Sequence, residues 1–331
     1  MNRLSELAKI AKKRRLDEVA VLSEANVRAL TGVNCDNAVI TTEFFYTDFR
    51  YTAAVRRVAP FLKVRDIKRV SLSGKRIGYE SSIPKKRFDE LKKLAPRNAR
   101  FVDISGDLDK VRAVKTEEEI ARIEKAQKLN LEIWEKAKAL FKPGMTEREM
   151  ARVIKRLQID LGDGEAFETI VCVGKNAAEC HHEPDDTVWN GREAVLVDMG
   201  VKLNGVMSDM TRTLPPRRKS PAFARAYELV KEAHDAAIAA ARPGMTAAAL
   251  DKIARDIIRR GGFGKAFGHS LGHGVGYQIH EAPTISKKNR KTVLKPGMIF
   301  TIEPGIYLED NFGIRLEDMV LLTDTGCRVL G

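Results

Sequence analysis

The chain has 331 residues, of which 44% are hydrophobic and 31% charged, the composition of an ordinary globular protein long enough for two domains. No run of about 18 apolar residues could span a membrane, and the basic N-terminus lacks the apolar segment of a secretory signal. The four cysteines are scattered without a CxxC spacing. We therefore expect a cytoplasmic protein with free thiols and exclude a membrane protein and a disulfide scaffold.

The net charge of +13 is concentrated at one end of the chain. Residues 1–110 hold 24 Lys and Arg against 14 Asp and Glu, so they carry +10 of it. Two basic runs, at 12–15 and 85–87, could bind nucleic acid or an acidic partner. No RNA-binding or zinc-finger motif accompanies these runs, and we favour a solvated basic surface over nucleic-acid binding.

The first third of the chain predicts a small α/β domain. We expect helices over residues 2–14, 24–31 and 85–94, strands over 19–22, 38–41, 44–47 and 76–79, and helix and strand in mixed order over 53–70. Thr116 and Glu119 have the spacing of a capping box, which predicts that a long helix begins there. The expected domains are residues 1–110 and 111–331.

The remainder contains an internal repeat with a period of 100 residues. The sequence KPGMT at 142–146 recurs as RPGMT at 242–246. Each copy follows a predicted amphipathic helix (117–141 and 221–241) and precedes another helix, an Ala-Phe pair and strand-like sequence. The repeat predicts an α+β architecture of two related halves whose sheets join, with helices outside and a deep site between the halves.

Two acids interrupt an apolar hairpin pattern over residues 195–213. Apolar residues alternate before Asn204–Gly205, the dipeptide that a type I′ turn prefers. That turn would place Gly200 opposite Asp209, so Asp198 and Asp209 would be diagonal neighbours on one face, roughly 7–8 Å apart or less at their β-carbons. Two carboxylates at this spacing repel unless they share a proton or a cation, which predicts a metal site.

Two further acids, Glu303 and Glu317, interrupt later strand-like runs. A turn centred on Asp310 would place them opposite one another, although a bulge at residues 304–305 would shift this register. Either acid by itself would more often be a structural ion-pair partner, as Glu317 could be for Arg315. The prediction of a site depends on the whole set of acids.

Five of the six histidines lie in two clusters. His234 stands alone in a predicted helix, where a packing role is expected. The other five are His181, His182, His269, His273 and His280, the last three in a glycine-rich segment. Hard oxygen ligands with imidazole suit Mn²⁺, Co²⁺, Fe²⁺ or Zn²⁺. The acids and histidines together outnumber the ligands that one tetrahedral ion needs, which two ions about 3.5 Å apart would explain. The chemistry predicted for such a pair is hydrolysis of an acyl bond.

These motifs resemble those of the pita-bread metallopeptidases, the family of aminopeptidase P, prolidase and methionine aminopeptidase. In the second part of the chain, the resemblance is carried by VDMG, SDMTRT, SLGHGVG, TIEPG and RLED in that order. In the first part, TGVNCDNAVIT and TDFRY resemble the creatinase-type N-terminal domain. It implies a pita-bread catalytic domain with a pseudo-two-fold repeat, preceded by a small α/β domain.

The resemblance also implies a role for each site residue. The implied metal ligands are Asp198, Asp209, His273, Glu303 and Glu317, with Asp209 binding both ions. Glu303 would be the general acid/base that works with a hydroxide bridging the ions. His181, His269 and His280 would bind substrate or stabilise the tetrahedral intermediate. Arg315 would orient Glu317 or Asp209. His182 would have a supporting role.

The expected activity is that of an Xaa-Pro aminopeptidase, which cleaves the bond between an N-terminal residue and a following proline. We expect two divalent ions, with Mn²⁺ before Co²⁺, Zn²⁺ or Fe²⁺, and a homodimer. The alternative is an Xaa-Pro dipeptidase (prolidase) that acts on dipeptides alone. A third interpretation is a non-catalytic binding protein on this fold whose basic N-terminal domain engages nucleic acid or a protein.

Overall fold

The computed structural model describes residues 3–331, which divide into two compact units between Arg112 and Ala113. The predicted start of the first helix at residue 2 lies outside the described residues. In the described part of the chain no helix has both the length and the apolar character needed to cross a bilayer. The four cysteines are free thiols, as expected.

From residue 3 onward, the first unit contains two three-stranded sheets, five α-helices and the 3₁₀-helix η1 (Ile67–Arg69). One sheet is parallel, with the order β1 (Glu18–Val19), β5 (Arg76–Tyr79) and β6 (Arg100–Asp103). The other has the order β2 (Ala38–Ile40), β3 (Phe45–Thr47) and β4 (Val64–Asp66). The helices are α1 (Leu4–Arg14), α2 (Glu24–Thr31), α3 (Phe49–Val58), α4 (Lys85–Lys93) and α5 (Ser105–Ala113). The predicted strand at 19–22 is shorter than expected, and α5 was not predicted.

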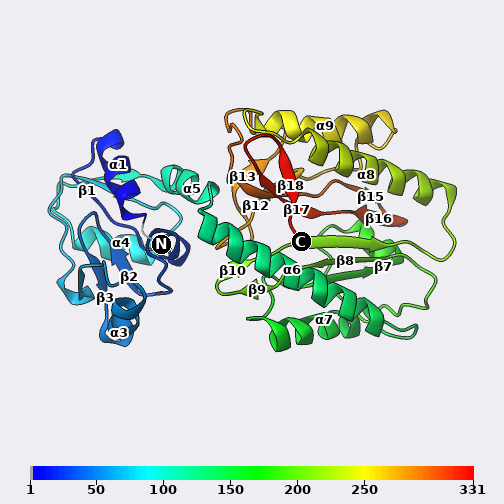
Figure 1. Ribbon diagram of the computed structural model, residues 1–331, viewed down its shortest axis with the longest axis horizontal. Helices are drawn as coiled ribbons and strands as arrows, with labels where there is room; N and C mark the ends of the chain where they lie inside the picture. Colours follow the sequence, from blue (N-terminus) through cyan, green and yellow to red (C-terminus); the bar gives the residue numbers. More distant parts are fainter. Residues whose placement is uncertain (1–2) are drawn as a thin grey trace. The chain divides into compact units, whose positions relative to one another are not determined.

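The second unit consists of two halves, each with two long helices followed by strands. The first half contains α6 (Glu117–Leu140), α7 (Glu147–Leu161), β7 (Ile170–Val173), the 3₁₀-helix η2 (Gly174–Ala178), β8 (Val195–Met199), β9 (Lys202–Leu203), β10 (Val206–Met207) and β11 (Met210–Leu214). The second contains α8 (Pro221–Ala240), α9 (Ala247–Arg260), β12 (Gly272–Gly274), β13 (Glu281–Ile285), β14 (Ile299–Ile302), β15 (Gly305–Leu308), β16 (Phe312–Arg315), β17 (Asp318–Leu322) and β18 (Cys327–Val329). The main sheets have the orders β11-β8-β7 and β13-β12-β14-β17-β18. Both helix pairs lie outside these strands (Figure 1).

The predicted repeat is confirmed at the level of backbone contacts. Thr146 and Thr246 cap α7 and α9 through their side chains, and each forms an isolated β-bridge to a distant segment. Gly144 and Gly244 both have positive φ, at 97° and 86°, which a residue with a β-carbon adopts only with strain. The same turn therefore joins the two helices in each half.

The first hairpin has the predicted register. Asn204 and Gly205 have φ values of 50° and 72°, which fit a type I′ turn. Leu203 pairs with Val206, and the same register continues to Asp198, which pairs with Thr211. Asp209 lies two residues from Thr211 on the same strand segment, so the two acids are the diagonal neighbours that the turn predicted.

The second hairpin also keeps its predicted register. Ile302 pairs with Asp318 in the β14–β17 ladder, and Gly305 pairs with Arg315 in the β15–β16 ladder. Both ladders have the same offset, so no bulge intervenes at residues 304–305 and Glu303 lies opposite Glu317.

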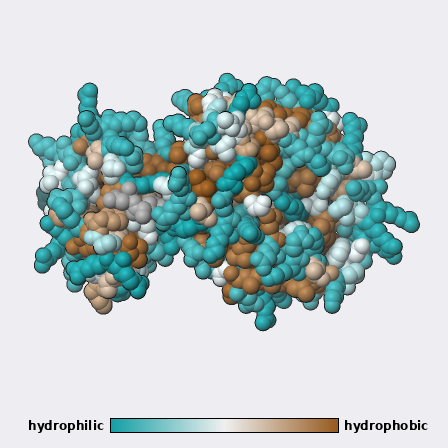
Figure 2. All heavy atoms as spheres, in the orientation of Figure 1, coloured by the Kyte–Doolittle hydropathy of each residue, from teal (hydrophilic) through white to brown (hydrophobic). Residues whose placement is uncertain are grey.

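Each unit has its own buried apolar residues. Leu7, Val27 and Ile40 belong to a core of the first unit, and Ile133, Val197 and Phe300 are fully buried in the second. Hydrophilic side chains cover most of the visible face of each unit, with hydrophobic ones between them (Figure 2). The buried acids of the second unit therefore stand out as the polar groups that need an explanation.

Candidate metal centre

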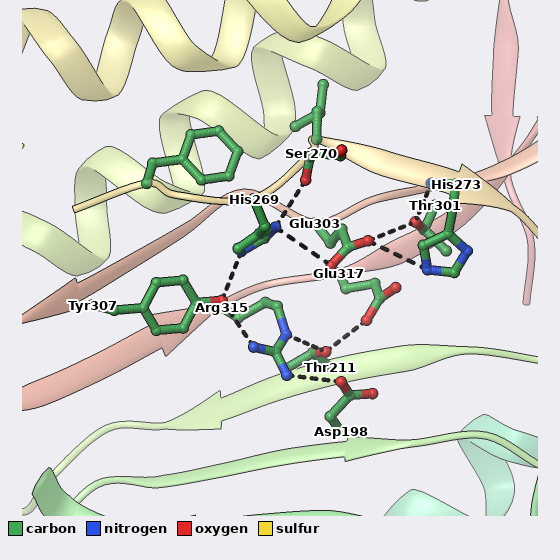
Figure 3. A network of polar contacts seen from close by, with 12 residues as sticks. Asp198, Thr211, His269, Ser270, His273, Thr301, Glu303, Tyr307, Arg315 and Glu317 are labelled. Carbon is green, nitrogen blue, oxygen red and sulfur yellow. Dashed lines mark hydrogen bonds and ion pairs between the residues drawn. The ribbon is translucent and has the colours of Figure 1, made fainter. Parts of the chain in front are cut away.

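Four carboxylates and one imidazole approach each other where the two halves of the second unit join. Asp198 lies in β8 and Asp209 directly before β11, while Glu303 follows β14 and Glu317 precedes β17. His273 in β12 has its Nε2 atom 3.6 Å from Asp209 Oδ2 and 3.4 Å from Glu303 Oε1. Asp209, His273 and Glu317 each offer a ligand atom within 4.8 Å of the others. The predicted ligands thus come from both halves (Figure 3).

The acids of this cluster are buried with too little positive charge around them. Burial, followed by the charges of neighbouring acids, raises the pKa of Asp209 and Glu317 well above the usual range. Burial also raises the pKa of Glu303 to about 8. Asp198 Oδ1 is buried and has no hydrogen-bond partner among the described residues. The donor set and its charge deficit fit divalent cations, which would let Asp209, Glu303 and Glu317 ionise.

The buried histidines beside these acids are neutral at physiological pH. Burial, and then the charge of His280, lowers the pKa of His273 to about 4. Neutral imidazole is the form that binds a metal. Burial also lowers the pKa of His269 to about 4, and its Nδ1–H donates to the carbonyl of Ser270 at 2.8 Å. Its Nε2 is then the acceptor for the Tyr307 hydroxyl at 2.9 Å.

Arg315 contacts one acid of the site directly and a second acid through Thr211. Its guanidinium donates to Asp198 Oδ2 at 2.7 Å, to Thr211 Oγ1 at 3.0 Å and to the Tyr307 hydroxyl at 2.8 Å. It reaches Glu317 only through Thr211, whose hydroxyl donates to Glu317 Oε2 at 2.6 Å. Asp198 is the acid that the guanidinium contacts directly, and the expectation that Arg315 orients Glu317 or Asp209 stays a prediction (Figure 3).

Tyr307 was missed by the sequence analysis. Its hydroxyl joins His269 to Arg315, and burial raises its pKa, so the phenol keeps its proton. The signal was present in the period of two along a strand, since Glu303, Gly305 and Tyr307 share one face. Gly305 leaves room for the ring, because a β-carbon there would lie 2.5 Å from the Tyr307 hydroxyl oxygen.

Two of the predicted histidines line the exposed side of the cluster. The ring of His280 lies 4.3 Å from that of His273, and His280 is exposed. His181 is also exposed, and its charge lowers the pKa of His280 after the larger effect of partial burial. His181 comes from the first half of the unit and His280 from the second, so the fold brings these two residues together.

The comparisons with known proteins agree with this geometry. The model of metallopeptidase family M24 matches residues 121–324, and that of the creatinase/prolidase N-terminal domain matches residues 3–114. The chain belongs to metallopeptidase family M24. The pita-bread fold with a preceding creatinase-type domain, expected from the sequence, is confirmed.

Relatives of this M24 protein are similar over nearly its whole length. A protein named Xaa-Pro dipeptidase from Pyrococcus furiosus is 34% identical, over 99% of this chain and 97% of the relative. A solved prolidase from Pyrococcus horikoshii OT3 has a TM-score of 0.92 at 32% identity, over 99% of this chain and 97% of the other. A solved X-Pro aminopeptidase from Thermotoga maritima MSB8 has a TM-score of 0.86 at 29% identity, over 97% of both chains. The protein is therefore a metallopeptidase.

Proposed function

We propose that this M24 metallopeptidase is an Xaa-Pro dipeptidase, which hydrolyses the bond between an N-terminal residue and a C-terminal proline. The observation that carries the proposal is the similarity, over 99% of the chain, to a relative named Xaa-Pro dipeptidase. The aminopeptidase was the expected activity, although the sequence by itself did not settle the choice. The names of the relatives move the preference to the dipeptidase, which was the alternative.

Two divalent ions are part of the proposal, held by Asp198, Asp209, His273, Glu303 and Glu317. Mn²⁺ is our first expectation, with Co²⁺, Zn²⁺ and Fe²⁺ as alternatives. Such ions polarise a substrate carbonyl and lower the pKa of water, which is the chemistry that amide hydrolysis requires. The buried acids with raised pKa and the unpartnered Oδ1 of Asp198 support this assignment.

Glu303 is the proposed general acid/base. Burial raises the pKa of its carboxyl, and a bound divalent ion would oppose that rise and keep the group ionised, ready to accept a proton. Its carboxylate would take a proton from the attacking water and deliver it to the proline nitrogen as the bond breaks. The nitrogen needs that proton, because an amine anion is a poor leaving group.

His181 and His280 are the proposed contacts for substrate, because both are exposed beside the cluster. The Xaa-Pro amide has no N–H, so the enzyme can hydrogen-bond this bond only through its carbonyl oxygen. An imidazole N–H can donate to the scissile carbonyl or to the terminal carboxylate. His269 uses both ring nitrogens within the protein, so we assign it to holding Tyr307.

The test compares a dipeptide with its extended form, for example Ala-Pro with Ala-Pro-Ala, on the metal-loaded enzyme. We expect kcat/KM to be at least about tenfold higher for the dipeptide. Equal or better turnover of the tripeptide would exclude the dipeptidase. It would instead support the X-Pro aminopeptidase, the candidate that the Thermotoga maritima structure favours.

Metal content separates catalysis from a binding role. The purified protein should hold about two divalent ions per chain by elemental analysis, and chelation should abolish hydrolysis until metal is restored. A metal-free protein without peptidase activity would contradict the proposal. Homodimerisation and a cytoplasmic location remain predictions, the first to be tested by light scattering.

A further inference from the structure

A second group of metal-ligand residue types, Glu147, His182 and Asp185, lies outside the candidate metal centre. Its central carboxylate is already fully used. Glu147 Oε1 accepts from the backbone of Val173 at 2.6 Å and from the side chain of Asn176 at 3.0 Å. Its Oε2 accepts from His182 Nε2 at 2.7 Å and from the backbone of Asp185 at 3.1 Å. A carboxylate has about four acceptor sites, so this group anchors the chain and leaves none for an ion.

The anchor is rigid on the side of the helix. Glu147 is the first residue of α7 and is fully buried, and Thr146 and Glu149 fix the helix start through a capping box. The backbone N–H of Glu147 also donates to the carbonyl of Thr187 at 3.1 Å. The four donors to its carboxylate and this carbonyl all lie within residues 173–187, a segment that we name the His181 segment.

The other side of the His181 segment packs on the strand that carries Arg315. A β-carbon at Gly313 in β16 would lie 1.6 Å from the carbonyl oxygen of Ala177 in η2, so the two backbones are in direct contact. His181 therefore sits on a segment held between Glu147 and the floor of the metal centre. Its position follows from these two contacts.

His182 is the one donor to Glu147 whose charge changes near neutral pH. Its Nε2 faces Glu147 from α7, and its Nδ1 faces Glu179 at 3.2 Å, so only the imidazolium can donate to both carboxylates. Asp185 is the third acid near the ring. Burial lowers the pKa of His182, but the hydrogen bonds to Glu147 and Glu179 outweigh it and raise the pKa above its ordinary value. Cys172 in β7 lies near Glu147 as a neutral thiol, because burial raises its pKa.

We propose that Glu147 and His182 are positioning residues for His181, and that the charge of His182 controls how tightly the enzyme binds substrate but not how tightly it binds metal. The proposal rests on the proposed function, in which His181 contacts substrate. Loss of the charge on His182 leaves one of two carboxylates without its donor, and the His181 segment loosens while the ligand-bearing strands remain in place.

The kinetic test compares wild type with His182→Ala and His182→Gln on an Xaa-Pro dipeptide. In the alanine variant we expect KM to rise about tenfold, with kcat within about twofold and metal content unchanged. The glutamine amide lies near the position of Nε2, so it keeps an uncharged bond to Glu147 but leaves Glu179 without a donor, and its KM should match that of wild type with neutral His182. Wild-type KM should rise as pH passes the raised pKa of His182, and that rise should be absent in His182→Gln.

A structural measurement tests the anchor without using activity. Hydrogen exchange of the amides in residues 174–187 should be faster in His182→Ala than in wild type. The matched control is Asp186→Asn, which removes the exposed partner of Arg148 from the same segment and should change neither KM nor exchange. A wild type that cleaves no Xaa-Pro peptide would end the proposed function, whereas the exchange comparison would still decide on the anchor.

Two results would overturn the inference. One is unchanged exchange and unchanged KM in His182→Ala. The other is a loss of kcat and metal content with KM unchanged, because that pattern would place His182 in the metal centre. If the alanine variant fails to fold, the pH dependence of KM in His182→Gln decides.

Discussion

The two halves of the catalytic unit share a scaffold but hold their histidines with different chemistry. In the first half the segment around His181 is bound by Glu147 and His182. In the second, position 247 is alanine, and the segment around His269 is bound by a residue about two turns further along α9. There Arg255 donates to the carbonyls of Phe267 at 2.9 Å and His269 at 2.8 Å and pairs with the buried Asp251.

The backbone contacts of the two halves are nearly the same. The N–H of Glu147 donates to the carbonyl of Thr187, and the N–H of Ala247 donates to that of Thr292. The side chains that anchor the histidine segments differ between the two halves. A shared backbone therefore constrains where an anchor can lie and leaves open which residue provides it. The practical difference is that histidine loses its charge near neutral pH whereas arginine does not.

The largest expected effect comes from removing one acid of the metal centre from either half. Asp209→Asn and Glu317→Gln should each lower kcat/KM by more than about 100-fold. A loss of roughly 100-fold is expected when the residue removed only supports a metal ligand. Both should lower bound metal, measured by elemental analysis. If only one half proved essential for metal, the location of the centre at the join of the halves would be wrong.

A smaller effect is expected from breaking the arginine anchor of the second half. Arg255→Met leaves the fully buried Asp251 without its cation, which should lower the free energy of unfolding by about 3 kcal/mol. The control is Arg259→Met on the same helix. The Arg259 side chain is exposed, so loss of its ion pair with Asp256 should leave the melting temperature nearly unchanged. Equal effects of the two variants would argue against the anchor.

The smallest effect is the pH dependence of stability that His182 contributes. Its folded-state pKa is raised, so the stabilisation is fully present below the ordinary pKa of about 6.5 and is lost as pH rises through the raised value. The difference in unfolding free energy between wild type and His182→Gln should shrink over that range. The difference in unfolding free energy between wild type and Arg255→Met should stay constant over the same pH range. If it declined in the same way, the two anchors would not differ in their response to pH.

Much of the candidate centre could be predicted from local patterns. The turn at Asn204–Gly205 determined the register that puts Asp198 and Asp209 on one face. The turn at Asp310 did the same for Glu303 and Glu317, because a hairpin register follows from turn length and side chains alternate along a strand. The repeat in the sequence indicated the two halves. Each of these signals spans a few residues or a simple period, so one sequence suffices to detect it.

Only the tertiary structure decided which side chains meet across the halves. The contact between Asp198 and Arg315 joins strands more than 100 residues apart, and no spacing in the sequence predicts it. The same holds for Glu147 and His182, which are 35 residues apart and had no assigned partnership. A buried charge takes the nearest complementary group that packing places beside it. That choice depends on the whole fold, whereas the register of a hairpin depends on its own turn.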